Sequence, residues 1–237
     1  MAVDSYILEQ YLKDGIPVLR VYSWSGPSFT YGVSQDPKDI LDIEKCMAES
    51  VSLAGRMTGG GVLFHNDELT YSFVCSKDDV GEPSAHLVAY RQICEFLLRF
   101  YRSLGLRASF ALECGDFLKR SAPSDLCAAS HEKYDIVING KKIGGNAQKR
   151  SRQAIFQHGS IPCSIDRVLE RRYLKNFHET DFGVTTLKEE LKTVPDKNIL
   201  EDNLIEAFTS TFGFDVEEEN IFSTEEALGF GQAVLAR

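Results

Sequence analysis

The sequence predicts an α+β fold, because its strand patterns come in groups and do not alternate regularly with helices. Strand patterns occupy residues 18–24, 61–65, 69–75, 134–145 and 155–165, and helical patterns occupy residues 3–13, 36–49, 84–104 and 200–212. The chain has 237 residues with no internal repeat and no low-complexity tract. We therefore expect one continuous domain in which a sheet packs on helices.

The first part of the chain is expected to run helix, strand, helix, strand, strand. Apolar residues in 3–13 recur at three- and four-residue steps, as on one face of a helix. Residues 18–24 alternate as a strand before a Gly-Pro turn, and residues 36–49 are expected to be helical. Residues 61–65 and 69–75 are expected to be two strands joined by a short turn at Asn66-Asp67.

The second part is expected to contain a long helix, a hairpin, a strand and further helices. The helix near residues 84–104 stops at Gly105. Residues 134–145 predict a hairpin with Asn139-Gly140 as its turn, a dipeptide favoured in two-residue hairpin loops. Beyond the strand at 155–165, large apolar residues share one helix face over 200–212, and Ser223 with Glu226 has the capping-box spacing of one last helix.

Composition excludes several classes of function. The 35 acidic residues exceed the 26 basic ones, for a net charge of −9, which disfavours binding to nucleic acid. No stretch reaches the roughly 18 apolar residues of a membrane span. Residues 1–15 lack the basic and apolar regions of a signal peptide. We therefore expect a cytoplasmic protein without nucleic-acid or membrane partners.

The cysteines predict no metal site, because none of the six forms a C-x-x-C pair or lies beside a histidine at ligand spacing. Most are expected to be buried thiols. Cys127 differs, since it lies in a small, polar, loop-like stretch before a predicted strand. It is a candidate nucleophile, with His131 or His158 as its base, and an unreactive thiol is the alternative.

Three consecutive glycines, Gly59, Gly60 and Gly61, lead into the strand predicted at 61–65. Glycines let the backbone approach a ligand closely and present N–H groups to it. Arg56 could hold a carboxylate or phosphate through two N–H groups. The spacing does not fit a P-loop, and a flexible turn is the alternative for this segment. His65, at the end of the strand, also fits a structural role.

Lys141 and Lys142 lie in an apolar strand, where only one of two successive side chains can face inward. An inward lysine beside Gly144 and Gly145 could polarise a carbonyl or hold an acyl phosphate. The alternative is a hairpin lysine that faces solvent. His158, which precedes a glycine, equally fits a histidine of the core or of a sheet edge.

The order and spacing of these segments resemble the biotin/lipoate protein ligase superfamily, and within it the lipoate-attachment enzymes. The resemblance is carried by residues 24–35, by RMTGGGVLFH at 56–65, by GKKIGGNAQKR at 140–150, by IFQHGSI at 155–161 and by VTTL at 184–187. It implies a central mixed, largely antiparallel sheet flanked by helices. It also implies a single catalytic domain over residues 1–237, without an accessory C-terminal domain.

The resemblance implies roles for individual residues. Lys142 falls on the family's essential lysine, and Cys127 on the nucleophile of cysteine-dependent octanoyltransferases. The substrate-binding positions that it implies are Arg56, Thr58, Gly59, Gly60, Gly61, His65, Gly144, Gly145, Ala147, His158, Gly159 and Ser160.

Three features favour these octanoyltransferases over lipoate-protein ligases. HNDELTYS at 65–72 resembles the transferase pattern H-x-x-E-L-T-Y-S. Cys127 stands seven residues before Tyr134, which is the spacing of the transferase nucleophile. The chain also stops after one domain. Gly55, Gly61 and Ala128 depart from the transferase pattern and keep the ligase alternative open.

The implied reaction moves octanoate from an acyl carrier protein, or from another lipoyl protein, through a Cys127 thioester to a lysine of a lipoyl domain. Acceptors would be dehydrogenase subunits or a glycine-cleavage carrier, and no cofactor is needed. The ligase alternative uses ATP and Mg²⁺ through lipoyl-AMP, and a further alternative is a non-catalytic scaffold. Because such carrier proteins are usually acidic, we expect Lys141, Lys149, Arg150 and Arg152 to form a docking rim, and a solvated charged face is the alternative.

Overall fold

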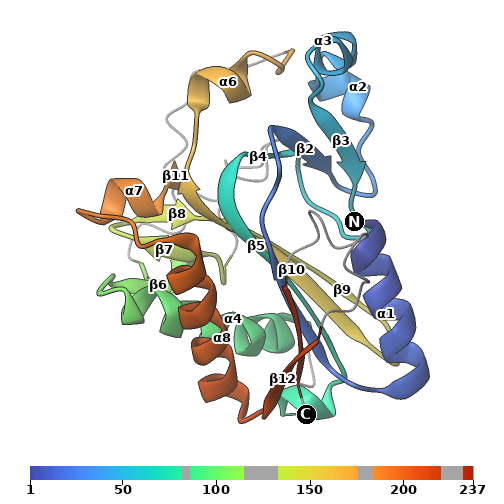
Figure 1. The fold of residues 1–237 in the computed structure, drawn as a ribbon, viewed down its shortest axis with the longest axis vertical. Coiled ribbons are helices and arrows are strands. Elements are labelled where there is room, and N and C mark those ends of the chain that lie inside the picture. Colours follow the sequence, from blue (N-terminus) through green and yellow to red (C-terminus); the bar gives the residue numbers. More distant parts are fainter. Residues whose placement is uncertain (82–85, 115–132, 176–183, 220–231, 237) are drawn as a thin grey trace.

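The fold is built around one large antiparallel sheet (Figure 1). The computed structural model describes residues 1–81, 86–114, 133–175, 184–219 and 232–236. Within these residues the large sheet has six strands in the order β12-β13-β1-β5-β10-β9, all paired antiparallel. These strands are β1 (Val18–Tyr22), β5 (Asp67–Cys75), β9 (Gly145–Arg150), β10 (Ile155–Ser164), β12 (Val216–Glu219) and β13 (Gln232–Ala236).

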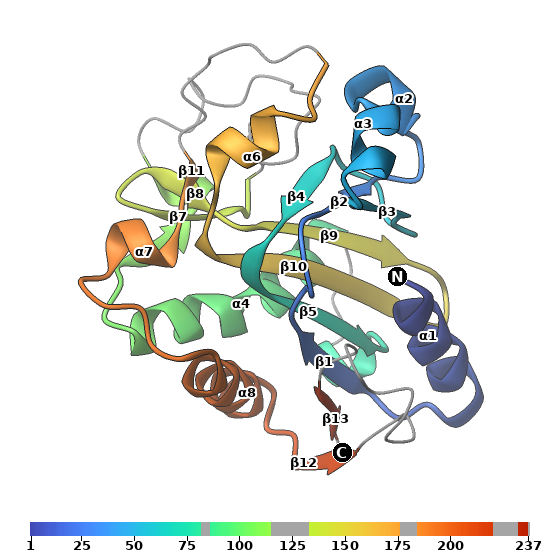
Figure 2. The ribbon, with the colours of Figure 1, turned by 45° about the horizontal axis from the view of Figure 1, so that its top comes forward.

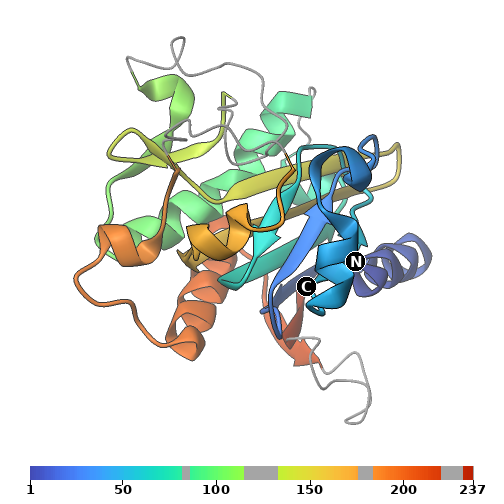
Figure 3. The same ribbon diagram turned by 90° about the horizontal axis from the view of Figure 1, so that it is seen from above.

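Two smaller sheets lie at one end of the large sheet, on opposite sides when seen from above (Figure 3). One has the described order β3-β2-β4, with β2 (Ser28–Tyr31), β3 (Ser52–Gly55) and β4 (Leu63–His65). The other has the described order β11-β8-β7-β6, with β6 (Ala108–Phe110), β7 (Ile136–Ile138), β8 (Lys141–Ile143) and β11 (Val184–Thr185). Each contains one parallel pair, so the predicted mixed, largely antiparallel α+β architecture is confirmed.

Helices cover both faces of the large sheet (Figure 2). On one face α4 (His86–Ser103) packs against α8 (Lys197–Phe212), and the ring of Phe208 meets Phe73 of β5 at 4.8 Å. On the other face α1 (Ala2–Asp14) buries Ile7 and Tyr11 in a cluster that includes Phe156 of β10. Because both faces are covered, β5 is buried from Glu68 to its end.

Shorter helices complete the described chain. They are α2 (Pro37–Ile40), α3 (Ile43–Ala48), α6 (Arg167–Arg171) and α7 (Leu187–Glu190), with 3₁₀ turns at Asp78–Val80 and Ala111–Glu113. Within the described residues no helix combines the length and the apolar character needed to cross a membrane.

The single helix predicted over residues 36–49 is wrong, because two short helices occupy this stretch. Leu41 is extended between them and forms a bridge with Leu174. Asp42 then caps α3 by accepting a hydrogen bond from the Lys45 N–H. A long-range backbone pairing therefore interrupts a locally helical sequence.

The strands predicted at 61–65 and 69–75 both exist, but they belong to different sheets. β4 pairs with β2, whereas β5 pairs with β1 and β10. The second strand already begins at Asp67, so Asn66 separates the two. The chain therefore passes from one sheet to the other at Asn66. As a result, His65 and Thr70 lie on different sheets and line the same pocket.

Other predicted elements are confirmed. The hairpin of β7 and β8 turns at Asn139 and Gly140, with φ of 50° and 74°. Gly105 and Gly213 follow α4 and α8 with φ of 81° and 72°, as expected of glycines that end helices. The start of the long helix predicted at 84–85 and the helix predicted from Ser223 lie outside the described residues.

Candidate active site

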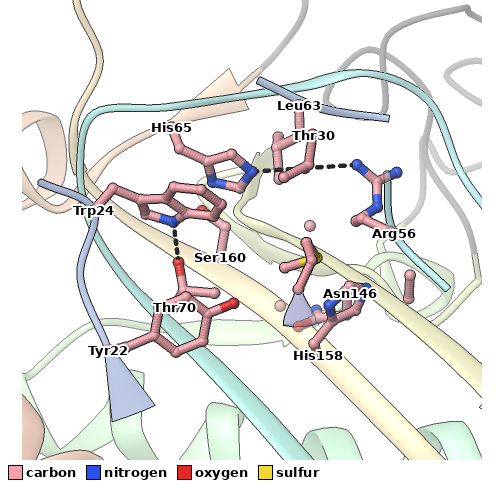
Figure 4. A pocket seen from close by; sticks show the side chains of 14 residues that line it. Tyr22, Trp24, Thr30, Arg56, Leu63, His65, Thr70, Asn146, His158 and Ser160 are labelled. Atoms are coloured by element: carbon pink, nitrogen blue, oxygen red, sulfur yellow. Dashed lines mark hydrogen bonds between the residues drawn. The ribbon is translucent and has the colours of Figure 1, made fainter. Parts of the chain in front are cut away.

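A pocket lies between the large sheet and the β3-β2-β4 sheet (Figure 4). A row of four paired residues, one from each of four neighbouring strands, forms its floor. The row runs from Tyr22 on β1 through Thr70 and Ser160 to Gly145 on β9. Thr30, Leu63, His65 and Arg56 line the pocket from the opposite side.

Arg56 holds the glycine loop against β2. Its Nη1 donates to Thr30 Oγ1 at 2.8 Å, and its Nη2 donates to the carbonyl oxygens of Gly61 at 2.6 Å and Gly59 at 3.4 Å. Gly60 has a φ of 100°, which favours glycine. The loop therefore turns carbonyl groups toward the buried guanidinium, which fixes the wall of the pocket.

His65 belongs to a directed chain of hydrogen bonds. Thr30 Oγ1 accepts from Arg56, so its own proton is available for His65 Nε2 at 2.7 Å. His65 Nδ1 then donates to Glu68 Oε1, also at 2.7 Å. Both ring nitrogens of His65 are therefore engaged by side chains of the fold.

Trp24 and Thr70 complete this hydrogen-bond network, which thereby reaches the floor of the pocket. Thr70 Oγ1 donates to Glu68 Oε1 at 2.6 Å and accepts from Trp24 Nε1 at 2.9 Å. The Trp24 ring stacks on His65 with centroids 4.2 Å apart. The polar groups on this wall are thus satisfied by one another, and the indole offers the pocket an apolar surface.

His158 lies on the pocket floor beside the glycine loop. Its Nε2 is 2.7 Å from Thr58 Oγ1. Burial lowers the pKa of His158 from 6.5 to about 4, so the imidazole is neutral near pH 7. The contact ties β10 to the loop and adds no charge to the pocket.

Two glycines allow β9 and β10 to approach their neighbours closely. Gly144 has a φ of 72°, and a Cβ on it would fall on the carbonyl oxygen of Ser160. A Cβ on Gly159 would overlap the side chains of Asn146 and Tyr71. These two side chains share a hydrogen bond of 2.9 Å below the floor, and Tyr71 also accepts from Gln157.

Lys142 faces inward and Lys141 faces solvent. Lys142 is 3% exposed, and its Nζ lies 2.8 Å from Asp135 Oδ2 in a buried ion pair. It is three residues from Gly145, where the floor of the pocket begins. Lys142 does not itself line the described pocket but stands beyond its β9 end.

Comparison with known proteins identifies the family. The model of the lipoyl protein ligase A/B catalytic domain matches residues 1–212. The chain belongs to this family. The resemblance seen in the sequence motifs is confirmed, and the sheets described above are those of a lipoyl ligase-type catalytic domain.

Curated relatives in this family are octanoyltransferases. Octanoyltransferase LipM of Exiguobacterium sp. (strain ATCC BAA-1283 / AT1b) is 35% identical over 170 residues, which are 70% of this chain and 62% of that protein. LipM of Bacillus cereus is 32% identical over 243 residues, which are 96% of this chain and 86% of that protein. The chain thus spans less than two thirds of the Exiguobacterium relative and most of the Bacillus one.

Solved structures of similar fold are lipoate-protein ligases. Lipoate-protein ligase A bound with ATP has a TM-score of 0.75 and 26% identity, covering 96% of this chain and 85% of that one. Ta0514, a putative lipoate protein ligase from T. acidophilum with bound lipoic acid, has a TM-score of 0.73 and 25% identity, covering 96% and 86%.

The fold of this lipoyl ligase-family chain brings seven of the residues implied by the resemblance to the pocket. They are Arg56, His65, Gly145, Ala147, His158, Gly159 and Ser160. Thr58 contacts His158, while Gly59, Gly60 and Gly61 form the loop around Arg56. Gly144 and Lys142 lie at the β9 end. Cys127 and His131 lie outside the described residues.

Sequence reasoning missed Tyr22, Thr30, Leu63 and Asn146, which also line the pocket. Strand alternation could have found Tyr22, since it shares a strand face with Arg20. Thr30 and Leu63 face each other across β2 and β4, and this pairing joins segments distant in sequence. Nothing in the local sequence signals that pairing.

The four basic residues expected to form one rim lie in two places. Lys141 begins β8, whereas Lys149 and Arg150 end β9, beside α1 in Figures 1 and 2. Arg152 follows in the same turn and is exposed. Lys141 and the pair Lys149 and Arg150 therefore lie on different strands, with the pair at the end of β9 that is remote from β8.

Proposed function

We propose that the protein is an octanoyltransferase that attaches an octanoyl group to the acceptor lysine of lipoyl domains. The observation that carries the proposal is the half-open pocket between the sheets, whose lining surface is mostly apolar. Its ionisable groups are already engaged, with Arg56 on loop carbonyls, His65 on Glu68 and His158 on Thr58. Such a pocket suits an alkyl tail, whose burial contributes about 0.8 kcal/mol per CH₂.

Cys127 is the proposed acyl carrier, a role that rests on its place in the sequence motif. Its thiolate attacks the carbonyl carbon of the acyl group, and a new C–S bond forms. The thioester C–S bond breaks when the donor is an acyl carrier protein, whose thiolate leaves. The amide C–N bond breaks when the donor is a lipoyl protein, whose lysine amine takes up a proton and leaves. The lysine amine of a lipoyl domain then attacks the enzyme thioester. A C–N bond forms, the Cys127 thiolate leaves, and the amine proton passes to solvent or a base.

Lys142 is the proposed stabiliser of the oxyanion in both steps. Asp135 holds its ammonium group at the β9 end of the pocket, where the carbonyl of a tail lying on the floor would emerge. A charge that is already fixed in place needs no reorganisation when the negative charge develops on oxygen.

The proposed donor is an acyl carrier protein or another lipoyl protein, and the proposed acceptors are lipoyl domains of dehydrogenase subunits or of a glycine-cleavage carrier. The exposed basic residues Lys149 and Arg152, with Arg150 between them, are the proposed contact for these acidic proteins. The relatives named octanoyltransferase support a reaction that requires no ATP.

The similarity to a lipoate-protein ligase bound with ATP favours one second candidate, ligation of lipoate through lipoyl-AMP with ATP and Mg²⁺. Intact-protein mass spectrometry distinguishes the two. The enzyme is mixed with octanoyl carrier protein and an apo lipoyl domain, without ATP. The transferase gives an octanoyl adduct on the enzyme and an octanoylated acceptor, and Cys127→Ala loses both.

Cys163→Ala is the matched control, because Cys163 is buried in the core and its thiol pKa is raised to about 11 by burial. It should keep the adduct. Modification of the acceptor solely when lipoate, ATP and Mg²⁺ are supplied would reject the transferase and identify a ligase. A chain that modifies no acceptor under either condition would be the non-catalytic scaffold.

A further inference from the structure

The Trp24 indole forms part of the pocket wall although Trp24 is not part of a strand. It follows the end of β1 by two residues, is half-buried and lines the pocket. Figure 4 shows the indole with His65 on one side and Thr70 on the other. Because no strand ladder fixes this stretch of backbone, the orientation of the indole depends on the contacts of its side chain.

Two hydrogen bonds in series join the indole to Glu68. An indole N–H can only donate, so Thr70 Oγ1 accepts from Trp24 Nε1 at 2.9 Å and gives its own proton to Glu68 Oε1 at 2.6 Å. The same Glu68 oxygen lies 2.7 Å from His65 Nδ1, and the His65 ring stacks on the indole. One carboxylate oxygen therefore orients both rings of the stack.

Glu68 lies behind this wall. It is 3% exposed and is not among the residues that line the pocket. Its backbone oxygen accepts from Ser23 Oγ at 3.2 Å, so Ser23 and Trp24 are both tied to the start of β5. A ligand in the pocket would meet Trp24 and Thr70, and Glu68 can influence binding only through such neighbours.

We propose that Thr70 and Glu68 are positioning residues that hold the Trp24 indole in its binding orientation before an acyl tail enters the pocket. This inference rests on the proposed acyl-binding function of the pocket. A wall that is already ordered spares the ligand the free-energy cost of ordering it. Without the Thr70 hydroxyl the indole loses its link to Glu68, and binding of the tail has to order the ring.

Two substitutions at Thr70 distinguish positioning from direct contact with the tail. Thr70→Val replaces the hydroxyl by a methyl group, so direct apolar contact alone predicts equal or tighter binding. Positioning predicts that Thr70→Val weakens binding of octanoic acid about three- to tenfold. Thr70→Ser loses the methyl group but keeps the hydroxyl, and it should change the affinity by less than about twofold.

Octanoic acid binding to the full chain is measured by isothermal titration calorimetry. Thr185→Val is the matched control, because Thr185 is also a buried strand threonine that donates to a glutamate, Glu190, but it does not line the pocket. Trp24 is the single tryptophan of the chain, so acrylamide quenching of its fluorescence reports on the free pocket. Quenching should increase in Thr70→Val and stay unchanged in Thr70→Ser and Thr185→Val.

A double-mutant cycle tests whether Thr70 acts through the indole N–H. In a Trp24→Phe background this N–H is absent, so adding Thr70→Val should change octanoic acid binding by less than about twofold. A general loss of folding or of pocket shape would instead weaken binding in both backgrounds.

Binding is measured apart from transfer, so the two proposals can fail separately. Weaker binding by Thr70→Val alone supports the positioning role even if no octanoyl transfer occurs without ATP, a result that would reject the transferase proposal alone. Equal or tighter binding by Thr70→Val, an equal loss in Thr70→Ser, unchanged quenching, or an undiminished effect in the Trp24→Phe background would overturn it. The absence of octanoic acid binding to the unaltered protein would overturn it as well.

Discussion

The Nζ atom of Lys142 lies 2.8 Å from the Asp135 carboxylate, and both side chains are almost completely buried. Val137 pairs with Lys142 across the β7–β8 hairpin, so the turn at Asn139-Gly140 sets the lysine's register near Asp135. Removing one member of a buried pair leaves an unpaired charge, whereas removing both does not. Single and double substitutions of the two residues can therefore distinguish the contribution of the ion pair to stability from the proposed role of Lys142 in the reaction.

Asp135→Asn should lower the free energy of unfolding by about 3–5 kcal/mol, because Lys142 would remain buried without its counter-charge. The double change Asp135→Asn with Lys142→Met should recover most of this stability but remain inactive. Urea unfolding and octanoyl transfer are measured on the same preparations. A double variant as unstable as Asp135→Asn would contradict the ion-pair explanation.

His158 should make stability depend on pH. Its pKa is about 4 in the folded protein and 6.5 when exposed, so between these values the unfolded chain binds more protons. Stability should therefore fall as pH drops through this window. The His158 contribution should decrease by about 2 kcal/mol between pH 7.5 and pH 5.

Unfolding of the unaltered chain and of His158→Gln at the two pH values measures this contribution as a difference. The variant should lose part of the pH dependence that the unaltered chain shows. Equal slopes for the two proteins would mean that the imidazole is not held neutral in the fold.

The glycine loop offers a matched pair of substitutions. Gly60 has a φ of 100°, so Gly60→Ala should cost about 1–2 kcal/mol of folding free energy. Gly59 lies outside the left-handed region, and a Cβ on it meets nothing within 4 Å. Gly59→Ala should change stability by less than about 0.5 kcal/mol. Thermal unfolding compares the two, and equal losses would refute the assignment.

Charge reversal at the end of the β9–β10 hairpin should weaken docking of an acidic carrier protein. Arg150→Glu with Arg152→Glu should raise KM for that substrate about three- to tenfold, since each exposed ion pair is worth about 0.2–1 kcal/mol. The kcat value should stay unchanged, because these side chains are remote from Lys142.

Arg107→Glu provides the control for this charge reversal, because Arg107 is exposed between α4 and β6. Steady-state kinetics at low and high salt are compared for the variants. The difference in KM should shrink at high salt, where exposed charges are screened. Unchanged KM in the double variant, or an equal rise with Arg107→Glu, would reject this surface as the docking site.

The sequence alone was sufficient for the family, the α+β class and the elements whose signals are local. The Asn139-Gly140 turn and the glycines after α4 and α8 were predictable because backbone conformation at these positions depends on the residue itself. The motifs at 56–65, 140–150 and 155–161 likewise contain the seven predicted residues that line the pocket. Their order along the chain carried the family resemblance.

Other features were decided by tertiary structure. Alternation showed that one of Lys141 and Lys142 faces inward, but burial beside Asp135 selected Lys142. Arg56 was expected to hold an anionic ligand, and the fold instead supplies carbonyl oxygens from its own loop. The partners of these groups come from other segments or from a backbone path that the sequence pattern does not reveal.

Tyr22 shows most clearly the difference between features set by the local sequence and features set by the tertiary structure. Its strand was predicted from residues 18–24, yet its unsatisfied hydroxyl depends on Arg20, Asp4 and the alignment of four strands. Turns and helix ends follow from neighbouring residues, because their energetics are local. The environment of a buried polar atom follows from desolvation and long-range strand register, which exist only once distant segments have packed together.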